Sequence, residues 1–135
     1  MSQKITTSND VLRARSKQET LTTTQDISVN DAGAEFNIAT DAKIMSLPAI
    51  SAENIGMEFT FRNTGADGAN IITLSPAATD AIHGAVAAVN SGGVNNKDWI
   101  NTKATANKGD WCTLKAVALT DWYCTGGDGV WASES

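Results

Sequence analysis

Alternation of apolar and polar side chains with a period of two is the feature that most constrains this chain. In residues 56–63, GMEFTFRN, the apolar Met57, Phe59 and Phe61 are separated by polar residues. Successive side chains of a β-strand point to opposite faces of its sheet, so this segment predicts a half-buried strand. Similar stretches, bounded by proline or by turn residues, recur along the chain. They are residues 35–40, 43–48, 70–76, 82–89, 99–106, 110–119 and 122–125.

Strands at this spacing, with turn signals between them, indicate an all-β domain. The chain has 135 residues, which suits a single domain with one core. No predicted strand is followed by a helical pattern, which argues against a doubly wound α/β fold. We therefore predict an antiparallel β-sandwich of jelly-roll type. Residues 110–119 and 122–125 are predicted to form a terminal hairpin across residues 119–121.

The first 24 residues differ from the rest in charge and in periodicity. They carry four basic and two acidic residues, a net charge of +2, whereas residues 25–135 carry six basic and thirteen acidic residues, a net charge of −7. Two interpretations stay open, namely a disordered terminus and an arm that becomes ordered on a neighbouring subunit or partner. We describe residues 1–24 as an extended N-terminal arm and residues 25–135 as the β-sandwich body.

The composition argues against several classes of function. A net charge of −5 at pH 7 disfavours a general nucleic-acid-binding surface, because neutralising phosphate needs local Lys and Arg. No apolar run approaches the roughly 18 residues that suggest a membrane span. One His and two Cys leave few routes to a zinc site, a Cys–His nucleophile or a Ser–His triad. We therefore expect no catalytic residues, no metal ligands, no cofactor and no enzymatic activity.

The two cysteines fall on the two strands of the predicted hairpin. If the turn centres on Thr120, opposed residues lie equally far from it, whereas Cys112 lies eight residues before it and Cys124 four residues after it. This offset favours two buried, reduced thiols, and a disulfide remains the alternative. His83 has no ligands spaced for a metal, so we interpret it as a surface or turn histidine.

Four tryptophans fall in the last 40 residues. Alternation along the predicted strand places Trp111 on the same face as Thr113 and Lys115, opposite to the face of Cys112. Trp111 is therefore the tryptophan best placed for a surface or subunit contact. Two other interpretations stay open, namely packing at the rim of the body and a sugar-stacking platform formed by Trp111 or Trp99.

Several short segments, taken in order, carry a resemblance to a known module. They are IMSLPA (44–49), GMEFTF (56–61), IITL (71–74), IHG (82–84), KGDWCTL (108–114) and WYCTG (122–126). Over residues 36–131 the chain resembles a β-sandwich module of phage structural proteins, especially head decoration (cement) proteins. Similar modules occur in phage tail-fibre proteins. The alternative function is therefore a receptor-binding or carbohydrate-binding domain of a tail fibre.

The resemblance to decoration proteins implies a non-enzymatic virion protein. Such a protein is a homotrimer that binds the major capsid protein on the outer surface of the head, bridges capsid subunits and stabilises the shell, after assembly in the host cytoplasm. In these families the arm reaches a neighbouring subunit or the shell. We expect basic and apolar residues of the arm, together with one surface tryptophan, to make these contacts. They are Lys4, Val11, Leu12, Arg13, Arg15, Lys17 and Trp111.

Overall fold

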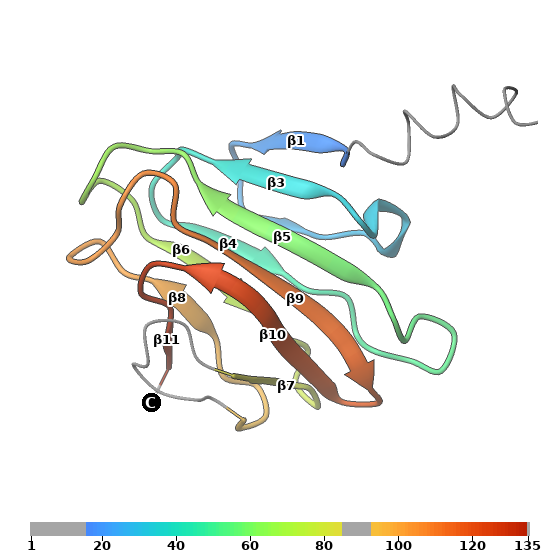
Figure 1. Cartoon of the computed structure of the whole chain (residues 1–135). Coiled ribbons are helices and arrows are strands. Elements are labelled where there is room, and N and C mark those ends of the chain that lie inside the picture. Colours follow the sequence, from blue (N-terminus) through green and yellow to red (C-terminus); the bar gives the residue numbers. More distant parts are fainter. Residues whose placement is uncertain (1–15, 85–92, 135) are drawn as a thin grey trace, which may run out of the picture.

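The computed structural model describes residues 16–84 and 93–134. This part of the chain forms two packed β-sheets and contains no α-helix, so the predicted all-β sandwich is confirmed (Figure 1). Sheet A contains, in spatial order, β1 (Gln18–Leu21), β3 (Glu35–Ile38), β5 (Glu58–Asn63), β9 (Trp111–Ala118), β10 (Asp121–Asp128) and β7 (Ala81–His83). Sheet B contains, in spatial order, β11 (Ala132–Ser133), β8 (Trp99–Asn101), β6 (Ile72–Ser75), β4 (Lys43–Ser46) and β2 (Gln25–Asp26).

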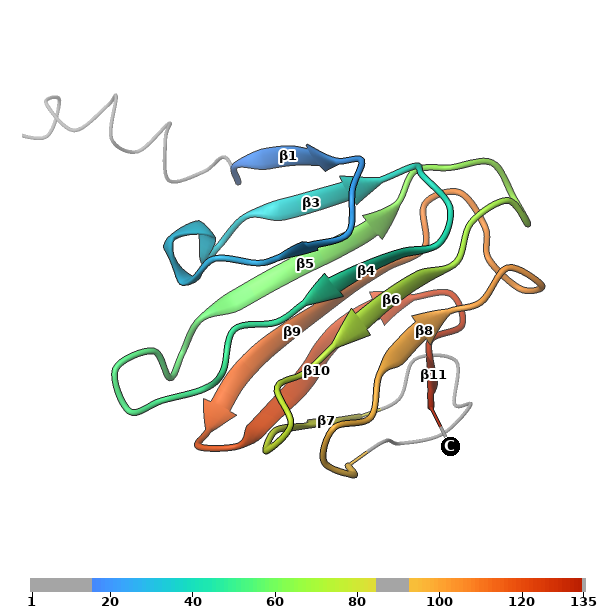
Figure 2. The same ribbon diagram turned by 180° about the vertical axis from the view of Figure 1, so that it is seen from behind.

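The first six strands wind back and forth between the two sheets. β1, β3 and β5 lie in parallel in sheet A, and β2, β4 and β6 lie in parallel in sheet B. Each strand of one sheet is followed by a strand of the other, so the chain forms a coil (Figure 2). The later strands pair mainly in antiparallel fashion, β8 with β6 and β11, and β9 with β5 and β10.

Within this sandwich, the predicted antiparallel, jelly-roll-like arrangement of the strands is wrong. Five of the nine strand pairs in the described part of the chain are parallel, including the pair of β7 and β10. Parallel neighbours need a crossover connection. In the coil, a strand of the opposite sheet supplies that crossover. Alternation with a period of two is the same for both directions of pairing, so the sequence pattern did not distinguish them.

An aromatic core lies between the two sheets. Phe59, the second residue of β5, has its ring centroid 6.1 Å from that of Phe36 and 6.0 Å from that of Trp122. Trp99 from sheet B and Trp131, just before β11, are fully buried with them. Burial of large aromatic side chains is the main source of stability in a small sandwich. Three of the four tryptophans therefore serve the core.

The predicted terminal hairpin is confirmed, and one predicted strand is shorter than expected. Ala118 pairs with Asp121 across a two-residue turn. The strand predicted over residues 99–106 ends at Asn101 with β8. There Thr105 donates its backbone N–H to the carbonyl of Thr102 at 3.1 Å, which makes a turn, since threonine hydroxyls also favour turns. Of the strand predicted over residues 82–89, residues 85–89 lie outside the described part.

Candidate interaction surface

The predicted arm contributes one strand to the body. Residues 18–21 form β1, the edge strand of sheet A, which pairs with β3. Several of the predicted contact residues lie outside the described residues. They are Lys4, Val11, Leu12, Arg13 and Arg15. The structure therefore gives the surroundings of two predicted contact residues, Lys17 and Trp111.

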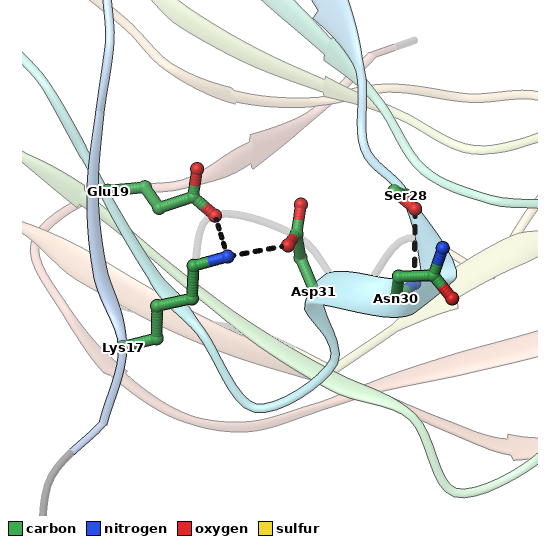
Figure 3. A network of polar contacts seen from close by, with 5 residues as sticks. All are labelled: Lys17, Glu19, Ser28, Asn30 and Asp31. Carbon is green, nitrogen blue, oxygen red and sulfur yellow. Dashed lines mark hydrogen bonds and ion pairs between the residues drawn. The ribbon is translucent and has the colours of Figure 1, made fainter.

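Lys17 is held between two carboxylates just before β1. Its Nζ lies 2.9 Å from Asp31 Oδ1 and 3.1 Å from Glu19 Oε2 (Figure 3). Asp31 belongs to the 3₁₀ turn η2 (Val29–Asp31), which begins where the hydroxyl of Ser28 accepts a hydrogen bond from the backbone N–H of Asn30 at 3.1 Å. The hydrogen bond to Asp31, followed by that to Glu19, raises the pKa of Lys17. Lys17 thus links residues 16–17 to η2. We call these two residues, where the N-terminal segment meets the body, the root of that segment.

The root of the N-terminal segment lies at one end of the sandwich, which we call the amino end. The parallel strands β1, β3 and β5 all begin there. The backbone N–H of Gly33, just after η2, donates to the carbonyl of Glu58 at the start of β5 at 2.7 Å. β9 runs antiparallel to β5 and therefore ends there. Figures 1 and 2 both show η2, the loop before β5 and the β9–β10 turn along this end.

Exposed apolar side chains gather at the amino end. Val29 in η2, Ile55 in the loop before β5, Val117 near the end of β9 and Leu119 in the following turn are 44, 44, 50 and 54% exposed. We call these four residues the apolar rim. They are four of the seven exposed large apolar side chains in the described part of the chain. Single exposed apolar residues are ordinary, whereas several of them at one end make that end a candidate interaction surface.

The two central members of the apolar rim are neighbours. The backbone N–H of Gly56 donates to the carbonyl of Ala116 at 2.8 Å, which places Ile55 beside Val117. Charged residues flank this pair. Glu53 and Glu58 are exposed and take part in none of the ion pairs found within residues 16–84 and 93–134.

The flanking charges are mixed, with carboxylates in the majority. Lys115 of β9 is exposed and lies opposite Glu58 in the strand register, although the two make no ion pair within the described part. Glu53 precedes Ile55 in the same loop. The apolar rim therefore lies next to two carboxylates and one ammonium group. Such a surface favours a partner that combines apolar and basic side chains.

Trp111 lies far from Lys17 and from the apolar rim. It faces outward on β9 as predicted, but it is half-buried, because its ring covers Gly126, where an added Cβ would lie 3.4 Å from Trp111 Cη2. Val117 is six residues further along β9, about 20 Å at the rise of a β-strand. The predicted contact residues are thus divided between two ends of the sandwich. Trp99 is fully buried, so the sugar platform suggested for it is wrong.

The outer face of sheet A between these two ends is polar and largely paired. Arg62 donates to Glu35 at 2.9 Å, and the hydroxyls of Thr60 and Thr113 lie 2.7 Å apart. A hydrogen bond from Gln18, followed by one from Arg62, lowers the pKa of Glu35. Side chains that already satisfy one another gain little from a new partner. This face therefore suits contact with solvent better than docking.

The thiols and the histidine form no centre with three ligands. Cys112 and Cys124 are both free, and burial raises the pKa of each thiol. They pair with different partners across the hairpin, as the offset predicted. His83 is half-buried, with Nε2 2.8 Å from Asp121 Oδ1 and its ring stacked on Tyr123 at 5.0 Å. Within the described ranges, no three His, Cys, Asp or Glu side chains gather in a way that could hold a metal.

Part of the apolar rim had a signal in the sequence. Val117 continues the outward phase of Trp111 and Lys115, and Leu119 is an apolar residue in a turn. Ile55 and Val29 had no comparable signal, because loops outside the strand pattern carry them. The sequence matches no family model, and no curated protein matches it. In the described part of the chain, no helix is long and apolar enough to cross a membrane.

Proposed function

We propose that this protein is a virion structural protein that decorates the outer surface of a phage head, where it binds the major capsid protein, bridges capsid subunits and stabilises the shell. One observation carries the proposal. The apolar rim and the root of the N-terminal segment lie at the same end of the sandwich, next to the carboxylates Glu53 and Glu58. A decoration protein needs one such end for docking.

The physical demands of this role fit a body of this kind. A cement protein works through contact area and through many copies, because avidity turns modest contacts into strong attachment. Sequence resemblance to head decoration modules points to the same role, with a homotrimer as the expected assembly. The acidic body, with a net charge of −7 over residues 25–135, disfavours adhesion to nucleic acid. In this role the protein performs no catalysis.

Shell binding by matched surface variants tests the proposal. Phage heads assembled without this protein are mixed with the full chain, with Leu119→Lys, or with Thr125→Lys, and the bound protein is measured after sedimentation. Leu119 is in the apolar rim, whereas Thr125 is an exposed residue of β10 outside it. Burying an unpaired Lys at an interface is unfavourable, so Leu119→Lys should weaken binding about tenfold or more, while Thr125→Lys binds like the unaltered chain. Failure of the unaltered chain to bind heads, or equal binding by both variants, would contradict the proposal.

A second candidate function is a carbohydrate-binding domain of a tail fibre. Tyr123 favours it, since the residue is 41% exposed and its ring is stacked on that of His83, which lies beside the carboxylate of Asp121. Aromatic rings with nearby polar groups suit the apolar face and the hydroxyls of a sugar. Selective binding on a glycan array that Tyr123→Ala abolishes would support this candidate over decoration.

A further inference from the structure

We propose that Asp128 and Gly129 form a site of spontaneous covalent modification, at which the main chain rearranges to isoaspartate. The sequence contains two Asp-Gly dipeptides, Asp67-Gly68 and Asp128-Gly129. Both aspartates are exposed. The two sites have the same reacting groups and differ in the hydrogen bonds that hold those groups. The rearrangement needs no partner, so it is independent of the proposed function.

At Asp128 the two reacting groups lie against each other. The backbone N–H of Gly129 donates to Asp128 Oδ1 at 2.9 Å. This contact holds the nitrogen of Gly129 beside Cγ of Asp128, which is the carbon that it must attack. Gly129 has φ of 90°, and an added Cβ would overlap the carboxyl group of Asp110, so only glycine fits here. No side chain of residue 129 therefore shields the nitrogen, and proximity favours closure of a ring.

The rearrangement has water as its only co-reactant. The nitrogen of Gly129 attacks Cγ of Asp128 in its carboxylic acid form, so that an N–Cγ bond forms and the Cγ–OH bond breaks. The amide proton and the hydroxyl group leave together as water, which gives a cyclic succinimide. A water molecule then opens the ring. Attack at Cγ restores aspartate, whereas attack at the main-chain carbonyl of Asp128 leaves the chain running through the side chain, as isoaspartate.

At Asp67 the same two groups are held by other partners. The backbone N–H of Gly68 donates to the carbonyl of Ala106 at 2.8 Å, and Asp67 Oδ1 accepts from the backbone N–H of Lys108 at 2.8 Å. Closure of the ring at this site must break both hydrogen bonds, which adds to the barrier. The fold therefore protects Asp67-Gly68 and leaves Asp128-Gly129 open to reaction.

Isoaspartate at position 128 would disturb the anchoring of a core tryptophan. The main-chain carbonyl of Asp128, the last residue of β10, accepts from Trp131 Nε1 at 3.2 Å. Trp131 is fully buried, and β11 follows directly after it. The rearrangement turns this carbonyl into a free carboxylate and lengthens the main chain by one methylene group. The modified chain should therefore hold Trp131 and β11 less firmly.

Ageing of the full chain tests the site. The folded protein is kept for several weeks in warm, neutral buffer, and isoaspartate at each site is measured by peptide chromatography with mass spectrometry. We expect at least about tenfold more isoaspartate at Asp128 than at Asp67, because two hydrogen bonds protect Asp67. The same chain in guanidinium chloride is the matched control. There the two sites should react at similar rates, because unfolding removes the protecting hydrogen bonds.

Two conservative variants and one stability measurement complete the test. Asp128→Glu keeps the carboxylate but requires a larger ring, so it should form no isoaspartate at position 128, whereas Asp67→Glu should age like the unaltered chain. The isoaspartate fraction of the unaltered chain, separated by ion exchange, should unfold at a lower urea concentration than the unmodified fraction. Undetectable isoaspartate at Asp128, or as much at Asp67 in the folded chain, would overturn the inference. An isoaspartate fraction as stable as the unmodified one would refute the effect on Trp131.

Discussion

The coil half of the molecule, β1–β6, and the hairpin half, β8–β11, build one core by different means. In the coil half, each strand is paired with a strand two positions away in the order of the chain. In the hairpin half, β9 and β10 are consecutive and are joined by a two-residue turn. Parallel winding brings the start of every coil strand in sheet A to one end, and the hairpin adds its turn there. The apolar rim is thus a joint product of both halves.

In sheet A, β5 connects the coil half to the hairpin half. A substitution in β5 is therefore expected to change the stability of the protein most. This strand pairs in parallel with β3 and in antiparallel fashion with β9. Near its start, Phe59 lies against Phe36 of the coil half and Trp122 of the hairpin half. Phe59→Ala should lower the free energy of unfolding by about 3–5 kcal/mol, because it opens a cavity in a fully buried site.

Urea denaturation of this variant, followed by tryptophan fluorescence and by circular dichroism, tests whether the halves are one cooperative unit. We expect a single transition with coincident midpoints. Phe59→Leu, which leaves a smaller cavity, should lose less stability. Two separate transitions would show that the halves unfold independently.

A buried polar network joins the halves at the end opposite to the apolar rim. Asn101 of β8 accepts from Asn63 Nδ2 at 2.8 Å and donates to Asp110 Oδ2 at 3.0 Å and to the carbonyl of Val130 at 3.1 Å. Asn101→Ala would leave the buried amide Nδ2 of Asn63 without its acceptor and would remove one of the two donors to Asp110 Oδ2, which keeps the backbone N–H of Asn107 at 2.9 Å. The free energy of unfolding should therefore fall by about 3 kcal/mol. Asn95→Ala, an exposed control, should change it by less than about 0.5 kcal/mol. Equal losses would mean that the network stabilises nothing.

Each half has a residue other than glycine with positive φ. In the hairpin half it is Thr120, with φ of 81°, and in the coil half it is Ala42, with φ of 60°. A β-branched residue in this region is strained by about 1–3 kcal/mol. Thr120→Gly should therefore raise the free energy of unfolding by about 1 kcal/mol after the added flexibility of glycine is subtracted. Ala42→Gly should raise the free energy of unfolding by a smaller amount, measured by urea denaturation. A larger increase for Ala42→Gly than for Thr120→Gly would show that Ala42 is the more strained residue.

Sequence patterns predicted strands in both halves, although not β1, β2 or β11, and the only pairing that they predicted was that of β9 with β10. Alternation in residues 56–63 located β5, and the hairpin was predictable because its strands are adjacent in sequence. The parallel pairing of the coil was not predictable, since its partners are separated by a strand of the other sheet. Without that information, most of the apolar rim could not be predicted either. The coil brings Ile55 next to Val117 and places Val29 at the same end of the sandwich.

The smallest predicted effect concerns acid stability in the coil half. Hydrogen bonds from Gln18 and Arg62 lower the pKa of Glu35 below its ordinary value of 4.5. A carboxylate with a lowered pKa in the folded state stabilises the fold above its unfolded pKa, and this contribution is lost as the pH falls through the lower folded value. Glu35→Gln should thus be slightly less stable at neutral pH, by less than about 1 kcal/mol for a half-exposed ion pair.

The difference between Glu35→Gln and the unaltered chain should shrink as the pH falls below 4.5 and through the lower folded pKa of Glu35, because below that value neither chain carries the charge. Urea denaturation at a series of pH values measures it. Glu53→Gln removes a carboxylate that makes no ion pair within residues 16–84 and 93–134, so it controls for the change in net charge. A gap that stays constant with pH would indicate that Glu35 acts through packing. The ion pair of Glu35 with Arg62 would then contribute nothing to the stability of the coil half.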